Sequence, residues 1–129
     1  MRRLASALVL GVMLSETSLA QQTTRVSVDS AGVQGNGDSG SEFHTVSISA
    51  DGRFVAFWSY ATNLVPGDTN GDYDVFVHDR QTGQTTRVSV DSFGAQGDDE
   101  TLHCSIAADG RYVAFASRAT NLEIGRAHV

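Results

Sequence analysis

Residues 50–57 read ADGRFVAF and residues 108–115 read ADGRYVAF, so one stretch occurs twice in the chain with a single difference. An Asp-Gly pair supplies the positive φ angle that a tight hairpin turn requires, and the apolar residues that follow it favour a β-strand. In both copies this strand leads to the tetrapeptide ATNL, at residues 61–64 and 119–122. The chain is therefore a tandem repeat.

A second motif is also repeated. Residues 22–30 (QTTRVSVDS) recur unchanged as residues 84–92. Polar and apolar residues alternate in this motif, which predicts strands over residues 23–29 and 85–91 with Thr and Val on one face and Arg, Ser and Asp on the other. Such alternation is typical of a half-exposed outer strand.

Further strands are predicted between these motifs, at residues 44–49, 53–59 and 74–78. Strand 53–59 carries apolar side chains on both faces, so it should be central in its sheet and covered on both sides. The connection at residues 31–42 is four residues longer than its counterpart at residues 93–100, which marks a surface loop. Each repeat thus holds four strands in about sixty residues, which favours a β-propeller blade or a similar array.

The composition fits one small all-β domain. The chain has 129 residues, of which 40% are hydrophobic and 19% charged, and its 13 glycines and single proline favour strands joined by turns. Its net charge of −6 argues against a nucleic-acid partner, because recognition of phosphates requires clustered positive charge.

The first twenty residues have the pattern of a secretory signal peptide. Arg2 and Arg3 precede an apolar run from Leu4 to Leu14, and residues 18–20 (SLA) resemble a cleavage signal. The apolar run is too short to cross a bilayer, which takes about 20 residues. We therefore expect an exported mature chain that begins at Gln21, lies in the periplasm or outside the cell and has no membrane span.

Cys104 is the one cysteine in the sequence, so an intrachain disulfide is excluded in spite of the expected export. In the repeat it stands at the position of Val46. Because cysteine packs readily as a small apolar residue, the sequence predicts a buried thiol at this position and not a nucleophile.

These motifs, together with residues 74–83 (DVFVHDRQTG), resemble the TolB-like and WD-repeat-like β-propeller repeats of exported bacterial proteins. The resemblance covers nearly all of residues 22–122. It implies four-stranded antiparallel blades around an axis, a non-enzymatic binding or scaffold module, and no catalytic residues. Some relatives carry a hydrolase domain beside the propeller, so the propeller portion of a larger secreted or periplasmic hydrolase is an alternative.

The resemblance also implies that the chain is a fragment. Residues 21–122 hold a lone outer strand at 23–29, one full blade at 44–91 and half of the next blade at 102–117, whereas propellers close with about four to eight blades. Residues 123–129 (EIGRAHV) match the translation of a sequencing adapter, and we expect them to be an artefact. Because repeat units are stabilised by their neighbours, we expect such a fragment to aggregate or to unfold without cooperativity.

One loop suggests a metal site. Asp68, Asn70, Asp72 and Asp74 place an oxygen-bearing side chain at every second position, as calcium loops do. Those loops have a glycine at the sixth position, whereas Gly71 is fourth here, and a turn bonded to its own backbone explains the same residues. A calcium-stabilised structural repeat is therefore a third alternative, and no other cofactor is expected.

Other polar residues fit structural roles. Residues 37–40 (GDSG) copy the segment around the nucleophile of trypsin-like serine proteases, but no histidine precedes this serine, so we expect a loop. His44, His78 and His103 lack the spacing of metal ligands and are expected to be ordinary strand residues. His128 belongs to the suspect tail.

Two aromatic residues could stack against a ligand. Trp58 and Tyr60 follow each other closely at the end of a predicted strand, but their counterparts in the second copy are Ala116 and Arg118, so neither is a feature of the repeat. We therefore expect a packing role for Trp58. A ligand of the module would be a protein, a glycan or a component of the cell envelope, and the sequence does not choose between them.

Overall fold

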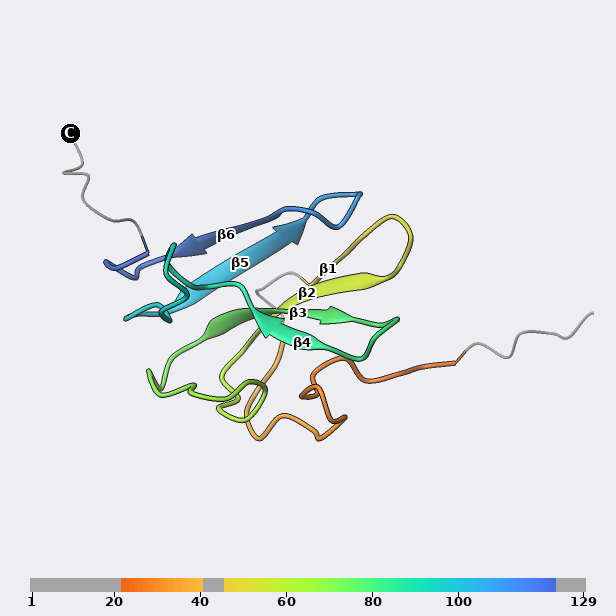
Figure 1. Cartoon of the computed structure of the whole chain (residues 1–129), viewed down its shortest axis with the longest axis horizontal. Coiled ribbons are helices and arrows are strands. Elements are labelled where there is room, and N and C mark those ends of the chain that lie inside the picture. The colour runs from red at the N-terminus through yellow and green to blue at the C-terminus, as the bar shows by residue number, and fades with distance from the viewer. Residues whose placement is uncertain (1–21, 41–45, 123–129) are drawn as a thin grey trace, which may run out of the picture.

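The computed structural model describes residues 22–40 and 46–122, which form an all-β structure (Figure 1). A four-stranded antiparallel sheet has the order β1-β2-β3-β4, and β5 and β6 form a second, two-stranded antiparallel sheet. The six strands are β1 (Ser47–Ile48), β2 (Phe54–Ser59), β3 (Asp74–Asp79), β4 (Thr85–Arg87), β5 (Thr101–Ile106) and β6 (Val113–Ser117). The expected all-β class and the four consecutive antiparallel strands are confirmed. The described part of the chain contains no helix that is both long and apolar enough for a membrane crossing.

Some expectations fall outside the described residues. The predicted signal peptide at residues 1–20 and the tail at residues 123–129, including His128, belong to this group. His44 also lies outside, so the strand predicted at residues 44–49 is seen as β1 alone, at Ser47–Ile48. These predictions therefore stay predictions.

Strand β2 is central in its sheet, as predicted. It pairs with β1 on one side and with all six residues of β3 on the other. Side chains on both of its faces are buried: Ala56 and Trp58 lie in one apolar cluster, and Phe57 lies in another. Apolar residues at successive positions thus bury both faces of this strand.

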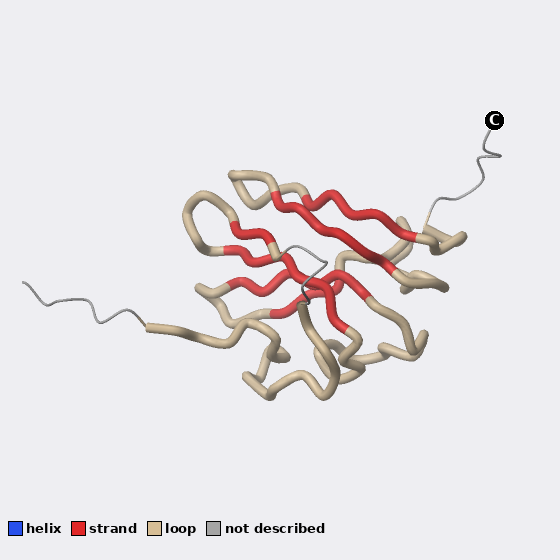
Figure 2. The backbone as a smooth tube through the Cα atoms, turned by 180° about the vertical axis from the view of Figure 1, so that it is seen from behind, coloured by secondary structure: helices blue, strands red, loops and turns tan. Residues whose placement is uncertain are grey.

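The two sheets pack face to face. One cluster joins Ala56, Trp58 and Val75 of the first sheet to Cys104 and Ile106 of the second. Cys104 is 2% exposed, which confirms the predicted buried thiol, and burial raises the pKa of this thiol. Seen from both sides, the β5–β6 hairpin runs along the first sheet (Figures 1 and 2). The second copy of the repeat therefore covers one face of the first.

The opposite face of the first sheet is covered by loops and by the N-terminal segment. Phe57, Phe76 and Leu64 form this second cluster, and Val26 packs against it. The two faces of the sheet are thus buried by different parts of the chain: one by the N-terminal segment and the loop between β2 and β3, the other by the second copy.

The repeated Asp-Gly turn has the same geometry in both copies. Gly52 has a φ angle of +71° and Gly110 one of +73°, so glycine alone carries the positive φ. The carboxylate of Asp51 accepts a hydrogen bond of 3.0 Å from the amide of Arg53, and Asp109 accepts the equivalent bond, also 3.0 Å. The aspartate thus closes the turn with its side chain.

The strand predicted at residues 23–29 is not present. This segment makes one isolated bridge, from Val28 to Gln34, and is not part of either sheet. The strand predicted at residues 85–91 is also shorter, since β4 ends at Arg87. The Val88 amide still donates to the Val75 carbonyl oxygen, but the Val75 amide donates to the hydroxyl of Ser89, so a side chain interrupts the ladder there.

The burial of the second motif is also opposite to the prediction. Thr85 lies on the same face as Arg87, Ser89 and Asp91, which was expected to be the exposed one, and both Thr85 and Ser89 are buried. The hydroxyl of Thr85 donates a hydrogen bond of 2.5 Å to the carbonyl oxygen of Val28, and the hydroxyl of Ser89 donates one of 2.5 Å to Asp74 Oδ1. Polar groups can be buried here because each has a partner.

In each copy, a hydrogen bond from an asparagine side chain joins the loop before the first strand to the loop after the second strand. We call this bond the clasp. Asn63 Nδ2 donates a hydrogen bond of 2.9 Å to the Gln34 carbonyl oxygen, and Asn121 Nδ2 donates one of 2.8 Å to that of Gln96. A Cβ atom on Gly35 would lie 3.1 Å from the Cβ of Ala61, and Gly97 is packed as closely in the second copy. The shared ATNL motif is therefore explained by this clasp.

The four-residue length difference between the copies lies further along the chain than predicted. Ser39 and Ser47 pair with residues of β2 that correspond to the β6 partners of Thr101 and Ser105. The extra residues therefore fall between Ser39 and Ser47 and not in the earlier part of the 31–42 loop. In the second copy a bulge lies at this point, where His103 has a φ angle of +48°.

Candidate functional site

Three of the four residues of the calcium hypothesis, Asp68, Asn70 and Asp74, are brought together by contacts with one another and with Arg87. Asp74 is fully buried, and its Oδ2 accepts hydrogen bonds from Asn70 Nδ2 at 3.0 Å and from Arg87 Nη1 at 3.3 Å. Arg87 Nη1 also lies 3.5 Å from Asp68 Oδ1. Asp72 contributes its backbone amide, which donates to Asn70 Oδ1 at 3.1 Å.

A guanidinium group thus already supplies positive charge between the two buried carboxylates. Burial, and then the negative charge of Asp74, raise the pKa of Asp68, whereas Arg87 acts in the opposite direction. Within residues 22–40 and 46–122, no group of three or more His, Cys, Asp and Glu side chains is arranged to hold a metal ion. The arrangement fixes the loop before β3 to β4, and calcium binding stays a prediction.

The other polar residues singled out in the sequence lie apart from one another. Ser39 shares a hydrogen bond of 2.7 Å with Ser59, next to β2. His78 is buried in β3 with its Nδ1 2.9 Å from Thr85 Oγ1, and burial lowers the pKa of this imidazole. His103 is exposed at the bulge of β5. The serine and these two histidines therefore have separate local roles.

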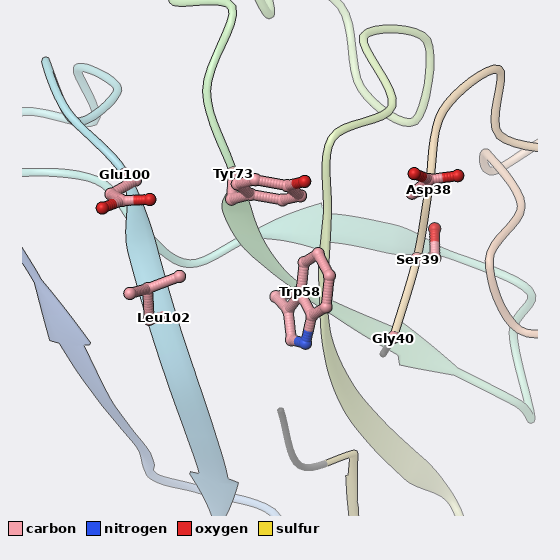
Figure 3. Close-up of a pocket in the computed structure, with 7 residues that line it drawn as sticks. All are labelled: Asp38, Ser39, Gly40, Trp58, Tyr73, Glu100 and Leu102. Carbon is pink, nitrogen blue, oxygen red and sulfur yellow. The ribbon is translucent and has the colours of Figure 1, made fainter. Parts of the chain in front are cut away.

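A pocket of about 350 Å³ lies where the two copies meet (Figure 3). The end of β2, the residue before β3 and the beginning of β5 all contribute to it. Its wall combines aromatic, acidic and small polar groups, which include Trp58, Tyr73, Asp38, Glu100, Ser39 and Leu102. This volume lies within the range of about 300–1,000 Å³ that is usual for small-molecule sites.

Three aromatic rings pack together at the pocket: Trp58 and Tyr73 line it, and Tyr60 lies beside it. The rings of Trp58 and Tyr73 meet edge to face, with centroids 4.7 Å apart and planes at 73°. The ring of Tyr60 lies on the other side, 5.1 Å from that of Tyr73. Trp58 is 3% exposed and Tyr60 is 45% exposed, so the packing role of Trp58 is confirmed while Tyr60 remains open to solvent.

The two carboxylates of the pocket stand at equivalent positions of the repeat. The carbonyl oxygen of Asp38 accepts a hydrogen bond of 2.8 Å from the amide of Tyr60, and that of Glu100 accepts one of 3.0 Å from the amide of Arg118. Figure 3 shows the two acidic side chains on opposite sides of Trp58. Consecutive copies thus each contribute one carboxylate to a shared pocket.

The electrostatic state of these two carboxylates differs. Glu100 forms an ion pair with the guanidinium of Arg118. Within the described residues Asp38 has no ion pair, because Tyr60 stands at the position equivalent to Arg118. The pocket therefore has one compensated carboxylate and one that is available to a cationic ligand.

Sequence reasoning found part of this site. Trp58 and Tyr60 are noticeable in the sequence because they differ from their counterparts in the second copy. Tyr73 and Glu100 were missed, because they come from separate strands and their proximity depends on the packing of one copy against the next. A search for departures from the repeat on the loops that flank β2 and β5 would have pointed to this region.

Comparisons with protein-family models, with curated proteins and with solved structures find no match to this chain. Its function is therefore inferred from the geometry of its own residues.

Proposed function

We propose that the chain is part of a non-enzymatic binding or scaffold module of an exported bacterial protein, built from consecutive four-stranded β-propeller blades. The observation that carries the proposal is the packing of the second copy onto the first, with the same clasp in each. Asn63 and Asn121 make equivalent bonds, and Ala50 donates a backbone hydrogen bond of 2.9 Å to Ala108 across the two copies. A repeat that packs on its own successor is typical of an array.

Surface burial supports the same proposal. Ala56 and Trp58 of the first copy are buried against the second copy, whereas their counterparts Ala114 and Ala116 are exposed. A further blade that follows the second copy would cover these two residues as β5 covers Ala56. The occupant proposed for this face is therefore another unit of the same repeat.

The binding part of the proposal rests on the pocket between the copies. It is lined by the half-buried ring of Tyr73 and by the exposed side chain of Asp38, which are groups that hold a ligand in place. Its residues come from two copies, so the pocket exists where the units are assembled. This arrangement links the scaffold role to the binding role.

The test is a screen of the full chain against arrayed peptides, glycans and cell-envelope components, with Tyr60→Arg as the pocket variant. This substitution gives the first copy the residue of the second and places a guanidinium beside Asp38. Thr86→Arg adds the same charge at an exposed position of β4 and is the matched control. We expect ligands to be retained by the wild-type chain and by Thr86→Arg and to be lost by Tyr60→Arg. Equal retention by Tyr60→Arg, or no retention by any form, would contradict the proposal.

A further inference from the structure

We infer that the pocket between the two copies binds an organic ammonium group, an inference that rests on the proposed binding function and names its ligand class. Three observations carry it: the residues that differ between the copies, the charges around the pocket and the arrangement of its rings.

The residues that the two copies share are those that build the fold. Ser59 and Ser117 have equivalent hydrogen bonds to the main chain, and each donates to the carbonyl oxygen of the acidic residue before the first strand. Asn63 and Asn121 close the same clasp. Folding alone thus accounts for these residues in both copies.

The residues around the pocket do not follow this rule. Trp58 and Tyr60 correspond to Ala116 and Arg118, although the backbone at these positions makes the same bonds in both copies. Burial against the second sheet accounts for Trp58, whereas Tyr60 is 45% exposed. Packing in the core therefore does not account for the aromatic ring of Tyr60, which lies against Tyr73 beside the pocket and has an arginine as its counterpart in the second copy.

The charges of the pocket select a cation. Among the described residues that line the wall, Asp38 and Glu100 are the ionisable groups apart from Tyr73, and the chain as a whole carries a net charge of −6. Arg118 compensates Glu100, so the second carboxylate, that of Asp38, is the one that a ligand would meet. An anionic ligand would be repelled by this wall, whereas a cation would be attracted to it.

The rings favour an organic cation over a simple metal ion. The half-buried ring of Tyr73 lines the pocket together with Asp38, and a ring face attracts an ammonium group by about 0.5–2 kcal/mol. A small hydrated metal ion gains little from such surface and requires several oxygen ligands. A primary or quaternary ammonium group is therefore the ligand chemistry that matches both parts of the wall.

The single tryptophan of the chain is Trp58, so its fluorescence reports on the pocket without a label. The full chain is titrated with tetramethylammonium chloride and with methylammonium chloride, at an ionic strength held constant with NaCl, and with neutral tert-butanol as the isosteric control. A lysine-containing tripeptide is compared with its acetyl-lysine form, so that a peptide source of the ammonium group is distinguished from a free amine. We expect saturable changes for the ammonium salts and for the lysine peptide, and none for tert-butanol.

Two variants make the result specific. Asp38→Asn should raise the dissociation constant about tenfold, since it removes the uncompensated charge. Asp99→Asn removes one charge from an exposed residue that bonds its neighbouring amide and does not line the pocket, so its dissociation constant should equal that of the wild type. Because Asp38 is exposed, its substitution leaves the packed core in place.

The outcomes separate this inference from the proposed function. An equal response to tert-butanol, or an unchanged dissociation constant in Asp38→Asn, overturns the ammonium class while a Tyr60-dependent ligand in the array screen still supports a binding module. No saturable response to any probe also overturns the inference. A loss of ligand retention throughout the array screen would instead overturn the proposed function itself.

Discussion

Strand β2 of the first copy and strand β6 of the second carry nearly the same residues, yet their surroundings differ. Val55 and Ala56 are buried, whereas Val113 is half-buried and Ala114 is exposed. Strand β2 pairs with β1 and β3 and is covered by β5, while β6 pairs with β5. Burial is therefore set by the neighbours that the rest of the chain supplies and not by the strand's own sequence.

This difference predicts that the two copies open separately. Hydrogen exchange measures the opening free energy of each strand without the requirement that the whole chain unfolds as one unit. Residues at equivalent positions of the two copies can therefore be compared, with the same residue type in different surroundings.

The largest effect is expected from the phenylalanines of the two strands. Phe57 is 2% exposed in the cluster behind β2, whereas Phe115 is half-buried at the interface between the copies. Phe57→Ala should lower the opening free energy of β2 and β3 by about 4 kcal/mol, and Phe115→Ala should lower that of β5 and β6 by about 2 kcal/mol. Equal losses in amide exchange would show that both strands are buried to the same extent in solution.

The next effect concerns the arginines of the second motif. Arg87 lies between the buried carboxylates of Asp68 and Asp74, whereas Arg25, at the same position of the motif, is exposed. Arg87→Ala leaves two buried carboxylates without their guanidinium, and we expect a loss of about 3 kcal/mol in the opening free energy of β3 and β4.

Arg25→Ala is the matched control for this experiment. Its expected effect is about 0.5 kcal/mol or less, as for other exposed residues. A large effect at Arg25 would contradict the description of its segment as one without a strand partner. A small effect at Arg87 would show that the buried carboxylates are compensated in another way, for example by a bound cation.

These comparisons also show which parts of the fold can be read from the sequence. The central position of β2 follows from apolar residues on both of its faces, and the hairpin turn follows from Asp51 and Gly52. Both are local properties, because the residues that determine them are close together in the chain. The all-β class and the four consecutive strands were predictable for the same reason.

The misjudged features depend on distant partners. Residues 23–29 have the pattern of a strand, but a strand also requires a paired neighbour, and within the described residues this segment makes only the bridge from Val28 to Gln34. The polar face of residues 85–91 is buried because Asp74 and Val28 accept its hydroxyl groups. Alternation of polar and apolar residues identifies the two faces of a strand, but it does not show on which face the polar side chains find hydrogen-bond partners within the fold.

The candidate site has the same limit. Trp58 and Tyr60 were noticeable because they depart from the repeat, which is a signal within the sequence. Glu100 and Tyr73 gain their role from the packing of β5 against β2, and their residue types alone do not indicate it. Because two copies form the site, the sequence of either copy alone indicates only the residues that this copy contributes.

The smallest effect is expected in the pH dependence of the opening free energy of β2 and β3, which comes from the ion pair of Arg53 and Asp79 in the first copy. Arg53 donates two hydrogen bonds to Asp79, of 2.9 and 2.7 Å, and these bonds hold the pKa of Asp79 well below its usual range. Because the pKa is lowered in the folded state, the stabilisation is present above the unfolded value of about 3.9 and is lost as the pH falls below it. The equivalent Arg111 has no such ion pair within the described residues.

The measurement compares the opening free energy of β2 and β3 at pH 6 and at pH 3. Arg53→Gln and Asp79→Asn should each remove part of the wild-type loss at pH 3, and they should do so to a similar extent because either substitution removes the same pair. Arg111→Gln should leave the pH dependence unchanged. If Arg111→Gln reduced the acid-induced loss as much as Arg53→Gln, the arginines of the two copies would have equivalent partners in solution, and the asymmetry between the copies would be confined to their apolar faces.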